Sequence, residues 1–321
     1  MEQTIISLET EGLFLSKKRG LLLASKRKEV ISTVPLDDIA ALIVSAHGTS
    51  YTNSLVVNLA ERNIPLVLCG KNHQPAAWIH PIKSHFKQAK YLRAQASLTK
   101  AKANRLWKQV VVAKISWQIF ALEKQGIVSK TLGRLARQVS NGDPQNIEAQ
   151  AARLYWRLMM GPNFRRETSG GGANILLNYG YTVLRAAVCR ALVAAGLNPC
   201  FGIHHRSQVN SFQLVDDLME PFRPLVDLAV KELVLNDDDE INPQTKAELG
   251  SILHHSLPGN GTGPVINHIY RLALEYRDYI AGDAEKIEFA FPKALTLPLK
   301  AARKTSVSTK RISPDVAIGN V

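Results

Sequence analysis

The sequence has few cysteines and no long apolar run. Three of its 321 residues are cysteines, at positions 69, 189 and 200, and none has the Cys-x-x-Cys spacing of a metal or redox motif. This use of cysteine is typical of a reduced compartment and favours a cytoplasmic protein. No window approaches 18 uninterrupted apolar residues, and the N-terminus carries acids where a secretory signal peptide carries lysine. The composition therefore argues against a disulfide-stabilised secreted protein and against a membrane protein.

Acidic residues are scarce in one long stretch, 81–140. It contains thirteen lysines and arginines against a single acid, Glu123, in a chain whose net charge is +13. Four of the basic residues recur at helical spacing and so share one helix face: Lys83, Lys87, Lys90 and Arg93. Solvated helices normally carry both signs of charge, and a run of one sign repels itself unless phosphates neutralise it. The stretch therefore predicts contact with nucleic acid.

The first 80 residues are predicted to form a β-rich, β-sandwich-like domain. Short apolar stretches bounded by glycines and charged turns indicate strands at 4–9, 12–18, 20–25, 29–34, 36–45, 64–70 and 76–79. One helix is expected from about Tyr51 to Arg62. The domain holds no catalytic constellation, so scaffolding or dimerisation is its expected role.

Long helical periods replace the strand pattern after His80. Helices are expected over 81–125, 126–140, the segment that holds Glu148, 174–195 and 264–281. Beyond Pro292 the composition is basic and poor in large apolar residues, which predicts a disordered tail. The predicted fold class is α+β: a β-rich N-terminal domain at 1–80, a larger all-α catalytic domain at 81–291, and a tail at 292–321.

A segment at 202–227 combines histidines and acids. His204 and His205 follow a Pro-Cys-Phe-Gly turn, whereas Asp217 and Glu220 lie three apart on one side of a helix that the next residue, a proline, should kink or restart. Carboxylates beside an imidazole repel one another unless a cation lies between them, so the segment is a candidate metal site. Alone, the pattern equally fits a solvated helix face and an ordinary histidine loop.

Two other stretches carry notable polar groups. Glu148 begins a helix that Asp143 or Asn146 can cap, and by local pattern it is an exposed first-turn glutamate favoured by the helix dipole. The segment RRETSGGG at 165–172 has no phosphate-binding fingerprint and is either a mobile basic loop over DNA or a plain connector. The candidate DNA contacts outside the basic stretch are Arg165, Arg166 and Asn178.

Three blocks, in this order, resemble the CRISPR-associated integrase family, which inserts new spacers into CRISPR arrays. They are IEAQAARLYWRLM at 147–159, ANILLNYGYTVLRAAV at 173–188 and GIHHRSQVNSFQLVDDLMEPFRP at 202–224. Together they cover most of the chain from about 145 to 235. The form that accompanies Cas9-type systems is the most similar.

The resemblance implies a set of metal ligands. Glu148 from the mid-chain helix, His205 as the last histidine of a G-x-x-H element, and Glu220 as the acid of a D-L-M-[D/E] element would bind one divalent ion and carry the catalysis. Two carboxylates and one imidazole suit Mg²⁺ or Mn²⁺. Asp217 is the implied auxiliary residue, and His204 stands where many members have an apolar residue.

The resemblance also implies a reaction and partners. With a DNA 3′-hydroxyl as nucleophile the reaction is transesterification, which joins a prespacer to the CRISPR repeat; with water it is endonuclease cleavage. The family forms homodimers through its β-rich domain and joins a small ferredoxin-like CRISPR adaptation protein on double-stranded DNA. Three hypotheses stay open here: an integrase, a general structure-specific DNA nuclease with the same ligands, and a non-catalytic DNA-binding scaffold.

Overall fold

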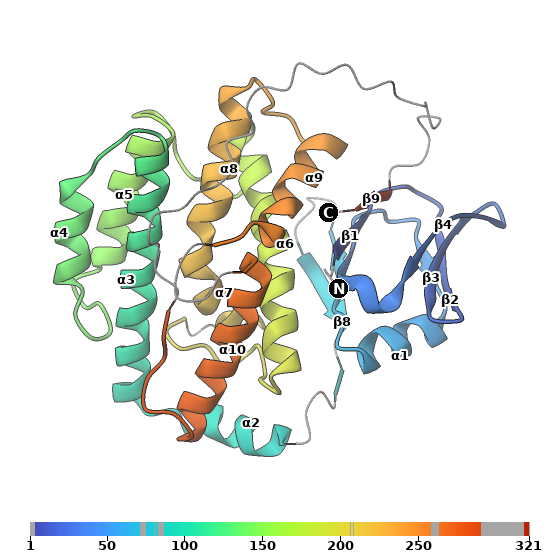
Figure 1. Ribbon diagram of the computed structural model, residues 1–321, viewed down its shortest axis with the longest axis horizontal. Coiled ribbons are helices and arrows are strands. Elements are labelled where there is room, and N and C mark those ends of the chain that lie inside the picture. The colour runs from blue at the N-terminus through green and yellow to red at the C-terminus, as the bar shows by residue number, and fades with distance from the viewer. Residues whose placement is uncertain are drawn as a thin grey trace.

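The chain folds into a strand-rich N-terminal region followed by a larger helical region (Figure 1), as the predicted α+β class requires. The computed structural model describes residues 4–70, 75–79, 81–82, 87–205, 207, 209–257, 263–289 and 318–320. Within these residues no helix is both long enough and apolar enough to cross a membrane.

Two sheets and one helix make up the N-terminal region. The five-stranded sheet has the order β8-β7-β5-β1-β9, and the four-stranded sheet has the order β4-β3-β2-β6. The strands are β1 Thr4–Leu8, β2 Phe14–Lys18, β3 Leu21–Lys26, β4 Glu29–Pro35, β5 Ile39–Val44, β6 Ser50–Tyr51, β7 Leu66–Cys69, β8 Pro75–Ile79 and β9 Ile318–Asn320. Helix α1 (Asn53–Glu61) is capped by the Thr52 side chain, which accepts from the Leu55 N–H.

Strand β5 connects the two apolar cores of the molecule. Its side chains alternate between the faces of the sheet, as the period of a strand requires. Leu42 and Val44 belong to the small core that also includes residues of both sheets and α1, whereas Ala41 and Ile43 belong to the large core of the helical region. The guanidinium of Arg190 in the helical region donates to the Ile39 carbonyl, 2.7 Å away. The five-stranded sheet is therefore covered on both faces.

The helical region is organised around two long helices. These are α3 (Lys100–Lys124) and α6 (Ala173–Ala194), and most residues of α6 are buried, as expected of a helix that is apolar on nearly every side. The helices packed around them are α2 Gln88–Ala96, α4 Lys130–Gln138, α5 Ile147–Met159, α7 Gln213–Met219, α8 Arg223–Leu235, α9 Pro243–Ser251 and α10 Val265–Ala281.

The chain differs from the predicted elements in several places. The helix expected from about Tyr51 begins at Asn53, after the short strand β6, and α9 was not predicted. The stretch expected as one helical segment over 81–125 contains two helices, α2 and α3, and the Thr99 side chain caps the second by accepting from Lys102 N–H. Near the C-terminus, β9 pairs antiparallel with β1 although it lies in the segment predicted to be disordered. The remainder of that predicted tail, 292–317 and 321, lies outside the described residues.

Candidate functional site

A lysine in the middle of α3 joins two acids from other elements. Lys114 Nζ lies 2.5 Å from Glu148 Oε1 and 2.5 Å from Glu220 Oε2. Because both oxygens touch one nitrogen, they lie within about 5 Å of each other. The Lys114 side chain is only 12% exposed, and a buried ammonium is stable only with opposite charge beside it. Two of the three predicted metal ligands thus share one cation.

Glu148 faces Lys114 because of how α5 begins. The Asp143 carboxylate accepts from the backbone N–H groups of Ile147 and Glu148, both at 2.9 Å, and the Asn146 side chain accepts from the N–H of the third helical residue. Both predicted caps are therefore used. The local pattern favoured an exposed glutamate, but the structure places the Glu148 carboxylate against Lys114 with 28% of its side chain exposed.

Glu220 is the more deeply buried of the two acids. It lies in the 3-10 turn Glu220–Phe222 (η2) where α7 passes into α8, at the proline expected to restart the helix. Burial alone would raise the pKa of Glu220, but the charges of Arg223 and Lys114 outweigh it and lower that pKa to about 2. Arg223 donates to Glu220 Oε1 at 2.7 Å. The other oxygen, Glu220 Oε2, is buried and lies 2.5 Å from the Lys114 ammonium.

A buried aspartate shapes the histidine loop. Asp217 Oδ2 accepts from the backbone N–H groups of Ile203 and His204 at 2.6 and 2.9 Å, and Oδ1 lies 2.5 Å from His205 Nδ1. This hydrogen bond raises the pKa of His205, mainly by favouring its charged form. The loop turns back on itself beside α7, so that a Cβ at Gly202 would lie 2.4 Å from the His205 carbonyl oxygen and 2.8 Å from the Cβ of Gln213.

The two histidines pack against one tryptophan. The His204 ring is stacked on Trp107 of α3, with centroids 4.2 Å apart and planes 5° apart, and burial lowers the pKa of His204. From the sequence, His204 was expected to face DNA or to pack against the helix of Asp217. The structure corrects the second alternative, because the ring packs on Trp107 of α3, and a contact with DNA stays a prediction. The His205 ring meets the same tryptophan edge-on at 5.6 Å.

The donor set suits a divalent cation at the two carboxylates. The part of the chain that the structure describes contains no group of three His, Cys, Asp or Glu side chains already in position to hold a metal ion. The predicted ligands instead form two neighbouring pairs, Glu148 with Glu220 around Lys114, and His205 with Asp217. The charge of Glu220 contributes to the raised pKa of His205, so the pairs influence one another. Two carboxylates that already face one cation are the kind of ligands that Mg²⁺ or Mn²⁺ takes.

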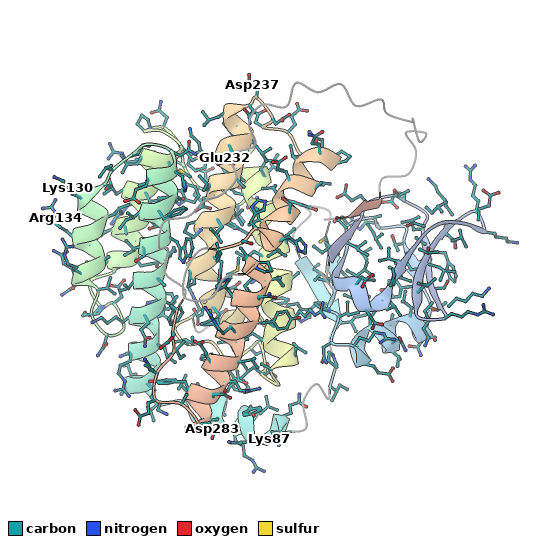
Figure 2. All side chains as sticks on the ribbon, in the orientation of Figure 1. Lys87, Lys130, Arg134, Glu232, Asp237 and Asp283 are labelled. Atoms are coloured by element: carbon teal, nitrogen blue, oxygen red, sulfur yellow. The ribbon has the colours of Figure 1, made fainter. Side chains whose placement is uncertain are left out.

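The predicted DNA contacts occupy two separate places. Lys87, Lys90 and Arg93 lie exposed at α2, where the Lys90 ammonium is 2.7 Å from the Asp283 carboxylate; Figure 2 shows Lys87 and Asp283 at this end of the molecule. Lys83 lies outside the described residues.

Three further candidates lie in or beside the loop before α6. Arg165 is exposed, whereas the Arg166 guanidinium donates to Asn178 Oδ1 at 2.6 Å.

Residues that the sequence did not single out complete the site. Trp107 and Lys114 are one heptad apart and share a face of α3, and Arg223 anchors Glu220. The sequence does contain one signal for Lys114, which interrupts an apolar run between Ala113 and Ile115 and so requires a buried acid as a partner.

Similar proteins are known. Residues 6–254 match the family model described as CRISPR associated protein Cas1. The CRISPR-associated endonuclease Cas1 of Neisseria meningitidis serogroup C is 38% identical over 247 residues, which cover 76% of this chain and 81% of that protein.

Two solved structures share the fold at lower identity. A casposase bound to integration product has a TM-score of 0.77 at 20% identity, covering 89% of this chain and 93% of that chain. A Cas6-RT-Cas1–Cas2 complex has a TM-score of 0.73 at 17% identity, covering 92% of this chain and 37% of that chain. At these identities the likeness shows the fold alone.

Proposed function

The chain belongs to the CRISPR-associated Cas1 family, and we propose that it is a metal-dependent DNA integrase of CRISPR adaptation. It would join prespacer 3′-hydroxyl ends to the CRISPR repeat by transesterification and would also cleave DNA. The name endonuclease of the Neisseria relative and the integration product bound to the casposase support this class of reaction. The observation that carries the proposal is the placement of Glu148 and Glu220 around a single cation.

Glu148, Glu220 and His205 would hold the ion, Mg²⁺ or Mn²⁺. When bound, a divalent ion polarises a phosphate, lowers the pKa of a nucleophilic hydroxyl and stabilises the leaving oxygen. Glu220 Oε2 faces the Lys114 ammonium, so the ion would compete with that ammonium for this oxygen. Arg223 holds the other oxygen of Glu220 and so fixes the direction of the carboxylate.

The contact of His205 with Asp217 determines which ring nitrogen is free. With Nδ1 committed to the buried carboxylate, Nε2 is the nitrogen left to act as a ligand or to contact the reacting phosphate. Asp217 thus positions His205 without being a ligand itself. The same carboxylate also accepts hydrogen bonds from the loop backbone, so the orientation of His205 and the path of the loop both depend on Asp217.

The partners follow from the same proposal. Double-stranded DNA, both prespacer and repeat, would be the substrate. The Cas6-RT-Cas1–Cas2 complex supports association with a small ferredoxin-like Cas2 protein. Homodimerisation through the strand-rich region is supported by Phe14 and Val30, large apolar residues of the four-stranded sheet that are 47% and 54% exposed.

A strand-transfer assay tests the proposal. A labelled short duplex is incubated with a plasmid that carries the repeat, with and without the Cas2 partner, in Mg²⁺, Mn²⁺ or EDTA. Joined products that disappear in EDTA, while circular dichroism stays unchanged, are the expected result. Cut strands without joined strands would indicate a general nuclease. Full strand transfer by Glu148→Ala or Glu220→Ala would overturn the assignment of these acids as ligands. DNA binding by the intact protein without joined or cut strands would leave only the scaffold hypothesis.

A further inference from the structure

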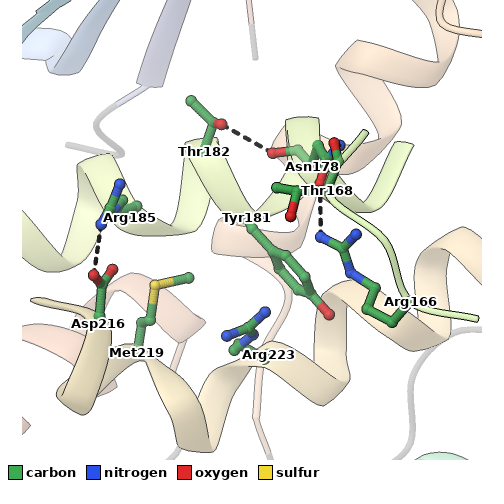
Figure 3. A pocket seen from close by; sticks show the side chains of 9 residues that line it. All are labelled: Arg166, Thr168, Asn178, Tyr181, Thr182, Arg185, Asp216, Met219 and Arg223. Atoms are coloured by element: carbon green, nitrogen blue, oxygen red, sulfur yellow. Dashed lines mark hydrogen bonds and ion pairs between the residues drawn. The ribbon is translucent and has the colours of Figure 1, made fainter. Parts of the chain in front are cut away.

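A cavity of about 150 Å³ is lined in part by Met219 and Arg223, which lie on either side of Glu220 in the chain (Figure 3). Its wall contains three arginines from three parts of the chain: Arg166 from the loop before α6, Arg185 from α6 and Arg223 from the start of α8. Arg223 belongs both to this wall and to the candidate active site, because it donates to Glu220. The cavity is therefore next to the proposed reaction centre but separate from the carboxylates.

The three arginines are not equally neutralised. Arg185 pairs with Asp216 at 2.6 Å, and Arg223 pairs with Glu220 at 2.7 Å. Within the described ranges Arg166 has no carboxylate in ion-pair distance. Its guanidinium donates to neutral oxygens instead, the side-chain amides of Asn174 and Asn178 and the Glu167 carbonyl. One positive charge of the cavity thus lacks a counter-ion from the protein.

Two donors in this wall are also unused. The Nε atoms of Arg166 and Arg185 are buried and have no hydrogen-bond partner in the described part of the chain. A buried donor left without an acceptor is unfavourable by the full loss of its hydration. Burial also lowers the pKa of Arg166, as expected of a cation removed from water. An anion in the cavity would offset the charge of Arg166, whereas the buried Nε atoms have almost no accessible surface and would stay out of its reach.

The guanidinium groups are held in place before any ligand arrives. The ring of Tyr181 lies 4.2 Å from Arg223 and 5.3 Å from Arg166, which lets each cation contact its π face. The hydroxyl of Tyr181 donates to the buried Asp227 carboxylate, which fixes the ring. Such preorganisation reduces the entropy lost on binding.

We propose that this cavity binds one phosphodiester group of a DNA strand that runs past Glu220. Arginine forks match the oxygens of a phosphate, and the cavity is much smaller than the roughly 300–1,000 Å³ of pockets that hold whole small molecules. The inference rests on the proposed function for the choice of DNA over free phosphate, which offers the same chemistry. The bound phosphate would be a neighbour of the reacting one and would set the register of the strand.

The test is a binding measurement without turnover. Fluorescence anisotropy in EDTA compares the intact protein with Arg166→Gln on duplexes in which single phosphodiesters are replaced by neutral methylphosphonates. One methylphosphonate position is expected to weaken binding by the intact protein about 10-fold. Arg166→Gln should weaken binding of unmodified DNA by a similar factor. The two changes together should weaken binding no more than either alone. The slope of log K against log salt should also fall by about one.

Controls keep the result specific. Arg157→Gln, an exposed substitution on α5, should bind like the intact protein, and Arg166→Lys should recover most of the salt slope because it keeps the charge. Thermal melting reports whether each variant is folded.

Two outcomes would overturn the proposal. One is that the effect of Arg166→Gln on binding adds to the effect of the methylphosphonate at every position tested. The other is stabilisation of the intact protein, but not Arg166→Gln, by millimolar inorganic phosphate together with no weakening at any methylphosphonate position, which would assign the cavity to a free anion. Since the assay involves no chemistry, a failure of strand transfer would leave its result unaffected.

Discussion

His205 Nδ1 lies 2.5 Å from Asp217 Oδ1, and the other oxygen of that carboxylate holds the backbone of the same loop. One fully buried acid therefore fixes both the path of the loop and the rotation of one imidazole. The neighbouring ring of His204 lies flat on Trp107 instead. The two adjacent histidines consequently have different environments and should have different roles.

We expect His205→Ala to lower strand transfer by about 100-fold or more while DNA binding persists, because the change removes one group at the reaction centre and leaves the other candidate DNA contacts in place. His204→Ala removes only a stacking contact and should have a much milder effect. Rates of joined-product formation and anisotropy titrations give the two readouts. An inactive His204→Ala beside an active His205→Ala would show that the ligand is one residue earlier.

Asp217→Asn tests the positioning role separately. The amide keeps the shape of the side chain but weakens its hold on the ring nitrogen and the loop N–H groups. Strand transfer should fall about 10- to 100-fold, and the apparent metal affinity should fall with it. If metal titrations of the variant match those of the intact protein, Asp217 has only a structural role.

Lys114→Met should destabilise the protein in EDTA by about 3 kcal/mol, because two carboxylates then face each other without the shared cation. Mg²⁺ or Mn²⁺ should raise the melting temperature of this variant more than that of the intact protein, since no ammonium competes for the oxygens. Lys108→Met, exposed on the same helix, is the matched control and should melt like the intact protein. Equal metal-induced shifts in all three proteins would contradict this account of the site.

Local patterns in the sequence predicted the elements of the fold but only part of the site. Asp217 and Glu220 were placed on one helical segment, and Asp143 and Asn146 were identified as caps, because such features depend on residues a few positions apart. The partnership of Lys114 with two distant acids was not predicted, since its lysine lies in a run of thirteen basic residues that all suggested DNA.

Orientation within the histidine loop could not be read from the sequence either. The sequence did not predict the stacking of His204 on Trp107, because Trp107 lies on a helix far earlier in the chain. In an extended segment, successive side chains point to opposite sides. This rule predicts that His204 and His205 point apart, but it does not predict which residues each ring contacts.

The basic face of α2 allows a graded prediction about DNA affinity. Arg93→Gln should reduce the slope of log K against log salt by about one if this residue contacts a phosphate. Lys90→Gln should reduce it less, because the Lys90 ammonium already lies 2.7 Å from the Asp283 carboxylate. Asp283→Asn should make the slope steeper by freeing that ammonium. A slope identical in all three variants would mean that this face only meets solvent.

Asp227 provides a pH-dependent test of the core around Tyr181. It is 3% exposed and accepts a hydrogen bond from the hydroxyl of Tyr181. Burial raises the pKa of Asp227 to about 6, and the favourable contacts with Tyr181 and Arg223 only partly oppose this. The folded state therefore prefers the protonated carboxyl more than the unfolded chain does, where the pKa is about 3.9.

The sign of the effect follows from this difference. A raised pKa in the folded state stabilises the fold fully below about pH 4, and this stabilisation is lost as the pH rises through about 6. Two pK units correspond to about 3 kcal/mol. Asp227→Asn has no proton to lose in this range and keeps an acceptor for Tyr181. Its free energy of unfolding, relative to that of the intact protein, should therefore rise by about 3 kcal/mol between pH 4 and pH 7 and then level off. Denaturant unfolding at a series of pH values measures the difference, and Asp237→Asn, at an exposed acid labelled in Figure 2, should track the intact protein throughout. A difference that stays constant over this range would show that Asp227 is ionised equally in the folded and unfolded chains. The Tyr181 hydroxyl would then donate to a carboxylate that stays charged throughout.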